Sequence, residues 1–274
     1  MQTPRDPRLA VFLLSLFASF APTTAPTTAY ANADALACVA PDDAPPARVA
    51  EPDISPELAG KGTVYHTVSG RQAQVTFTSE AKLQNIVGKS NAVVGYAVAG
   101  PVGAPAALAG GRWLLPIASL ATGIPLRDEH LAGEHWLDAA KHPMIEFVLE
   151  KTEDIASVKS GADFTTWTAT LVGSIEIHGV RKPLRVEKAK LSFLKASERT
   201  ASIAPGDLCF IQCTYEVKLT DFGVENGDIP GKVSDTIRLD QILRLSTVAV
   251  EAGREKVSGD ASKDEKPAKD GKTG

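Results

Sequence analysis

Apolar and polar residues alternate with a period of two through much of this sequence, and that period constrains its fold most. In Trp167–His178, for example, Leu171, Ile175 and Ile177 share one parity and Ser174 has the other. A strand with one apolar face is half-buried and needs a second layer to cover that face. The same alternation recurs within residues 63–77, 145–150, 184–193, 215–220 and 237–246. The sequence therefore predicts a mainly β domain, with one antiparallel sheet that is closed or folded on itself.

Two irregularities are expected within these strands. Gly70 separates the apolar run around Val68 from the next run, which predicts a hairpin between them. Further along, the apolar residues change parity between Val186 and Ala189. A change of parity within one strand requires an extra residue, so we expect a β-bulge near Glu187-Lys188.

One short helical insertion is expected between Leu114 and Phe147. Asp128 has the chemistry of an N-cap, since its carboxylate can accept a free backbone N–H of the first helical turn. The helix that follows would place one apolar stripe against the sheet and would end near Lys141, because Pro143 cannot continue it. After Pro143 the period of two returns, so the segment predicts strand, turn, capped helix and strand.

The two ends of the chain lack this periodic pattern. Residues 1–31 combine two early arginines with an apolar run, which is typical of a signal peptide cleaved after Ala31 or Ala33. Residues 32–60 are rich in proline and predict an extended segment, and the charged residues 251–274 predict a disordered tail. A single domain over residues 61–250 remains, and export predicts a periplasmic or secreted protein.

Composition excludes one class of partner and leaves the cysteines open. The net charge is −4, and no cluster of Lys and Arg is interleaved with aromatic residues, so nucleic acid is not an expected partner. Cys209 and Cys213 are four residues apart on a predicted strand, which places them too far apart to bridge unless a turn intervenes. Cys38 could instead pair with either of them.

The chain carries no pattern of a known catalytic or metal site. Its five histidines include no His-x(3)-His pair, and His130 and His135 would point in different directions on a helix. There is no nucleophile elbow, phosphate-binding loop or dinucleotide-binding glycine pattern. We therefore expect a protein that is not an enzyme and that has no metal or cofactor.

Three motifs resemble those of the polyisoprenoid-binding YceI-like family. They are SLATG with RDEHL and WLDAAKHPMIEF within residues 119–147, LVGSIEIHGVRKPL at residues 171–184, and LTDFGV at residues 219–224. Together they cover roughly residues 63–250 in the order of the family, which is more specific than one short motif. The resemblance implies a lipocalin-like barrel of about eight strands that holds an isoprenoid lipid.

The candidate site follows from the inward parity of the strands and from the charged start of the predicted helix. An eight-stranded barrel can hold one small ligand, and inward Val, Phe, Ile and Leu would give it an apolar lining. Arg127 suits a phosphate head group at the barrel mouth. The candidate ligand-binding residues are Val75, Phe77, Leu115, Ile117, Ile145, Phe147, Ile175, Ile177, Leu239, Gln241, Arg127, Asp128 and His130.

Each part of this interpretation has an alternative. Periodicity alone favours a filled core, and a secreted barrel with a filled core would act through protein contacts. Arg127 could pair with a carboxylate, and the amide of Gln241 could bind backbone groups instead of a ligand. The resemblance favours the hollow barrel, with an isoprenoid lipid as partner, no other cofactor, transient contact with a membrane and an undetermined oligomeric state.

Overall fold

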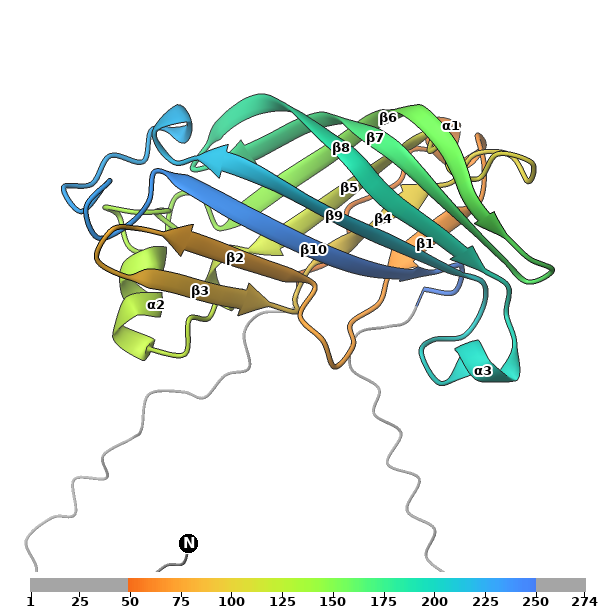
Figure 1. The fold of residues 1–274 in the computed structure, drawn as a ribbon, viewed down its shortest axis with the longest axis horizontal. Coiled ribbons are helices and arrows are strands. Elements are labelled where there is room, and N and C mark those ends of the chain that lie inside the picture. Colours follow the sequence, from red (N-terminus) through yellow and green to blue (C-terminus); the bar gives the residue numbers. More distant parts are fainter. Residues whose placement is uncertain (1–48, 250–274) are drawn as a thin grey trace, which may run out of the picture. The chain divides into compact units, whose positions relative to one another are not determined.

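The computed structural model describes residues 49–249, which form one β-barrel (Figure 1). Three short α-helices are present: α1 (Pro56–Ala59), α2 (Pro125–Ala132) and α3 (Glu198–Ala201). None of the helices in this part of the chain is long and apolar enough to cross a bilayer. The strands are β1 (Val64–Thr67), β2 (Val75–Glu80), β3 (Asn85–Ser90), β4 (Val94–Val98), β5 (Gly110–Pro116), β6 (Met144–Ser160), β7 (Phe164–Ile177), β8 (Val180–Leu194), β9 (Leu208–Lys218) and β10 (Thr236–Ser246).

The sheet closes on itself as an antiparallel barrel. Neighbouring strands follow the order β1-β4-β5-β6-β7-β8-β9-β10, and β10 pairs back with β1 to complete eight strands. The hairpin of β2 and β3 extends the same sheet, because β2 also pairs with β10. This arrangement confirms the mainly β, lipocalin-like barrel that the sequence predicted.

The hairpin expected at Gly70 is wrong. Both β1 and β2 run antiparallel to β10, with Thr67 opposite Leu245 and Val75 opposite Gln241. Two strands antiparallel to the same partner run in the same direction, so β1 and β2 are one barrel strand interrupted by residues 68–74. The hairpin of this region lies between β2 and β3 instead.

The β-bulge expected near Glu187-Lys188 is confirmed. Ala169 of β7 lies opposite Ala189, whereas Leu171 lies opposite Val186, so β8 carries an additional residue there. Lys188 adopts a left-handed backbone with φ of 55°. The bulge keeps Val186 and Ala189 both facing the interior, where they are buried.

The predicted N-cap at Asp128 is wrong, because the helix begins earlier. Pro125 occupies the first turn of α2, where its fixed φ and its missing N–H are tolerated, and Ile124 is the N-cap residue. Asp128 lies inside the helix and accepts hydrogen bonds from the backbone N–H and the hydroxyl of Thr122, at 2.8 and 2.6 Å. The helix ends at Ala132, well before the end expected near Lys141.

Several predictions concern residues outside the described part of the chain. These are the signal peptide with its cleavage sites, most of the Pro-rich extension, Cys38 and the charged tail. Cys209 and Cys213 lie on the continuous strand β9 and do not bridge each other. The one-turn helices α1 and α3 were not anticipated.

Buried side chains pack together at one end of the barrel. At the end formed by β1 and the neighbouring strand ends, near α3 (Figure 1), inward residues from seven strands pack against one another. They include Tyr65, Ala97, Leu149, Leu171, Leu191, Phe193, Cys209, Ile211, Leu243 and Leu245, all of which are buried. The filled-core alternative therefore describes this half of the barrel, and the opposite half is where space remains.

Candidate ligand-binding cavity

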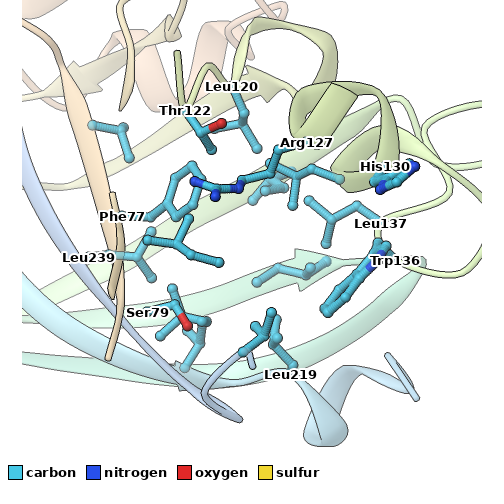
Figure 2. A pocket seen from close by; sticks show the side chains of 18 of the residues that line it. Phe77, Ser79, Leu120, Thr122, Arg127, His130, Trp136, Leu137, Leu219 and Leu239 are labelled. Carbon is cyan, nitrogen blue, oxygen red and sulfur yellow. The ribbon is translucent and has the colours of Figure 1, made fainter. Parts of the chain in front are cut away.

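A cavity of about 340 Å³ occupies the other end of the barrel, beside α2 and the hairpin of β2 and β3. Its volume lies in the lower part of the roughly 300–1,000 Å³ range of small-molecule sites. Figure 2 shows apolar side chains such as Phe77, Leu137 and Leu239 gathered around this space. The cavity therefore has the character expected of a site for an apolar ligand.

The wall of the cavity follows from the period of two within each strand. Alternate residues of β2, β7, β9 and β10 point inward at this end, and the remaining apolar side chains come from β3, β5, β6, α2 and the loops beside α2, β9 and β10. The predicted residues that line the cavity are Val75, Phe77, Leu115, Ile145, Ile175, Ile177, Leu239, Arg127 and His130.

Four predicted residues lie elsewhere. Ile117 is 1% exposed and belongs to the core in a 3-10 turn after β5. Phe147 stacks on Trp113, with ring centroids 5.7 Å apart. Asp128 is held by Thr122, and the amide of Gln241 is bound within a side-chain network. Phe147 and Gln241 each lie one inward position deeper than a residue of the cavity wall, so they belong to the layer beneath the cavity, which is called its floor below.

The floor also contains a small polar network. The amide of Gln241 donates to the hydroxyl of Tyr215 at 3.0 Å and accepts from the thiol of Cys213 at 3.6 Å. The prediction that this amide binds backbone groups is therefore wrong. Burial raises the pKa of Tyr215, and burial together with Asp240 raises the pKa of Cys213 to about 12. Both groups are protonated at neutral pH, so the floor carries no charge.

Charge is confined to the mouth of the cavity. Arg127 and His130 project from α2, and Lys232 lies on the segment before β10. Lys232 pairs with Asp228 at 2.9 Å, whereas Arg127 forms no salt bridge within residues 49–249. The alternative in which a carboxylate neutralises Arg127 therefore finds no support in the described part of the chain. A half-buried guanidinium beside an apolar cavity can bind an anionic group of a ligand.

Several wall residues were not among the predicted site residues. Tyr215, Val217 and Ile237 line the cavity from strands whose inward parity was visible in the sequence, so the signal existed. Trp136 and Leu137 come from the irregular loop after α2, where no periodicity exists to reveal their direction.

The barrel wall beside the cavity is incomplete. Strands β8 and β9 pair only where Lys190–Leu194 meets Leu208–Gln212. A second hollow of about 520 Å³ is found beyond that ladder and shares Ile175 and Val217 with the cavity. Charged residues of both strands line this hollow, so it is less suited to an apolar ligand than the cavity is.

A family model and several curated relatives match this chain. The family model of the YceI-like domain matches residues 65–244. A UPF0312 protein of Pseudomonas putida is 33% identical over 128 residues, and one of Pseudomonas syringae pv. syringae is 32% identical over the same length. Each of these matches covers 46% of this chain and 56% of the relative, so the chain spans little more than half the length of these curated relatives.

Solved structures of similar fold share little sequence with this chain. BcnA of Burkholderia cenocepacia aligns with a TM-score of 0.47 and 16% identity, covering 68% of this chain and 97% of BcnA. A polyisoprenoid-binding domain of Saccharophagus degradans, implicated in plant cell wall breakdown, aligns with a TM-score of 0.47 and 14% identity over 68% of this chain and 99% of that domain.

Proposed function

Since this chain belongs to the family defined by the YceI-like domain, we propose that it is a lipid-binding protein that holds a long isoprenoid chain, either a polyprenyl group or a quinone tail. The observation that carries the proposal is the apolar cavity at one end of a barrel whose other end is filled. A closed floor and an open mouth fit a ligand with an apolar tail and a polar head. The protein would shield the tail from water without changing it chemically.

Burial of the tail would supply most of the binding free energy. Each CH₂-sized group removed from water contributes about 0.8 kcal/mol, so one fully buried five-carbon isoprene unit contributes about 4 kcal/mol. Most side chains that line the cavity are apolar and cannot form hydrogen bonds with a ligand. A polar ligand would therefore lose its hydrogen bonds to water without replacement, so the cavity suits a hydrocarbon better. We therefore expect affinity to rise with the number of isoprene units until the cavity is full.

The head group would remain at the mouth beside Arg127. Hydrogen bonds to a charged group contribute about 1.5–3 kcal/mol, so Arg127→Met should weaken the binding of farnesyl monophosphate by at least about 10-fold. The same variant should bind farnesol as the wild type does. His130→Ala should keep the fold, because His130 is exposed.

These affinities can be measured by titration in buffer without detergent. Trp136 lines the cavity, so its fluorescence should change when a ligand enters. Binding of farnesol by the wild type tests the proposal itself, and the ratio of the two ligands in Arg127→Met tests the head-group contact. An equal loss of both ligands in that variant would contradict a role of Arg127 in binding the phosphate.

The site of action is part of the same proposal. The sequence of residues 1–31 supports export, which would place the protein in the periplasm or outside the cell. The rim of the cavity exposes apolar side chains, including Ile124 at 47% and Leu126 at 60%. Both of these residues also line the cavity, so transient contact of this rim with a membrane would allow a lipid tail to pass between bilayer and barrel.

A further inference from the structure

A group of three potential metal ligands lies outside the residues that line the cavity. Asp138 and His142 belong to the loop between α2 and β6, and His178 lies in the tight turn between β7 and β8. One ligand atom from each residue lies within 4.8 Å of the other two. Sequence analysis missed this group, because its third member follows the second by more than thirty positions and the first two are not on a helix.

The surroundings of His178 leave one ring nitrogen available. Its Nδ1 lies 3.2 Å from the carbonyl oxygen of Phe222, which fits a hydrogen bond donated by the ring. Histidines that bind metals commonly donate one ring N–H to a carbonyl or carboxylate and coordinate through the other nitrogen. This hydrogen bond fixes the ring of His178 in the way that metal sites use, and it leaves Nε2 available as a ligand.

His142 and Asp138 complete the group. The rings of His142 and His178 meet edge to face, with centroids 5.2 Å apart. Gly179 permits this approach, since a Cβ at that position would come within 2.4 Å of the His142 ring. Asp138 is 5% exposed, and its Oδ2 accepts a hydrogen bond from Lys141 at 2.9 Å. Its Oδ1 remains for a cation.

We propose that Asp138, His142 and His178 bind a divalent metal ion of the zinc type. Two imidazoles and one carboxylate are a donor set that Zn²⁺ and similar first-row ions accept, with a fourth position open to water. Ligand atoms around tetrahedral Zn²⁺ lie roughly 3.3 Å apart, given bonds of about 2.0–2.1 Å. Small side-chain rotations would bring the three ligand atoms, which now lie within 4.8 Å of one another, to this spacing. Lys141 is largely exposed and can turn toward solvent.

Such an ion would join segments that are distant in sequence at the cavity end of the barrel. Leu137 and Ile177 line the cavity, and each precedes a proposed ligand, Asp138 and His178 respectively. A metal ion would therefore fix the loop after α2 against the turn between β7 and β8. The metal site rests on its own donor geometry and does not depend on whether the cavity binds a lipid.

The test uses metal binding by the full chain without an added histidine tag. Calorimetric titration with Zn²⁺ should show one equivalent bound, and Co²⁺ in its place should give the visible absorption of a tetrahedral ion. His142→Ala and His178→Asn should each weaken Zn²⁺ binding by at least about 100-fold, since even the loss of a second-shell partner costs 10- to 100-fold. Asn is chosen at position 178 because it tolerates the left-handed φ of 52° found there.

His135→Ala is the matched control, because His135 is exposed on the same loop and lies outside the group. It should bind Zn²⁺ as the wild type does. Circular dichroism of each variant should match that of the wild type, which separates loss of a ligand from loss of the fold. Absence of stoichiometric Zn²⁺ binding by the wild type, or equal binding by the folded His142→Ala and His178→Asn variants, would overturn the proposal.

Discussion

Phe147→Arg is expected to lower the free energy of unfolding of the barrel by about 3–5 kcal/mol. Phe147 is half-buried at the floor of the cavity and stacks on Trp113, and the substitution removes this packing. It also places a guanidinium among inward apolar residues. Urea unfolding followed by circular dichroism would measure the change.

Glu150→Arg provides the matched control for this prediction. Glu150 is exposed on the same strand, β6, so the same guanidinium there should change stability by no more than about 0.5 kcal/mol. If Phe147→Arg unfolds at the same urea concentration as Glu150→Arg, then Phe147 does not belong to a packed floor, and the division of the barrel into a filled and a hollow half is wrong.

Leu239→Trp is expected to reduce isoprenoid binding by more than about 10-fold while the protein stays folded. Leu239 points into the cavity from β10, and a larger ring there would occupy part of the 340 Å³ that the tail needs. Added volume in an existing cavity should disturb the fold less than added volume in a packed core does. Farnesol titration and a thermal unfolding curve of the same preparation would separate the two effects.

Arg238→Trp is the control for the indole itself. Arg238 is the preceding residue of β10 and is exposed, so its side chain lies on the outer face of the barrel. This variant should bind farnesol as the wild type does. Equal binding by both tryptophan variants would place the ligand outside the cavity.

The strands could be predicted because the period of two is long and regular, whereas their closure into a barrel was implied only by the family resemblance. The inward positions Ile175 and Ile177 of β7 and Leu239 of β10 were identified from parity alone. The apolar residues of β8 change parity after Val186, and this change located the bulge. Only an extra residue in the strand lets the apolar residues before and after it face the interior. In each case, one local rule determined which face of the strand was buried.

The start of α2 was mispredicted because two local rules competed. Asp128 is a good N-cap residue, but Pro125 fits the first turn of a helix even better, and its fixed φ allows the helix to begin before Asp128. Because Asp128 lies inside the helix, its carboxylate accepts hydrogen bonds from Thr122 and does not cap the first turn.

The division of the barrel interior could not be predicted at all. Phe147 and Ile145 have the same parity on β6, yet one packs on Trp113 and the other lines the cavity. The difference depends on side chains from other strands and on the loop that carries Trp136 and Leu137. Long-range arrangement also creates the group of Asp138, His142 and His178, which no local spacing reveals.

Native mass spectrometry of the wild-type protein, purified without detergent, tests the central claim most directly. The hollow end of the barrel predicts a folded species heavier than the polypeptide by the mass of one lipid, and organic extraction of that sample should yield an isoprenoid. The same measurement on Leu239→Trp should show mainly the protein without lipid. A wild-type protein that carries no lipid and takes up none from added farnesol or polyprenol would contradict the account.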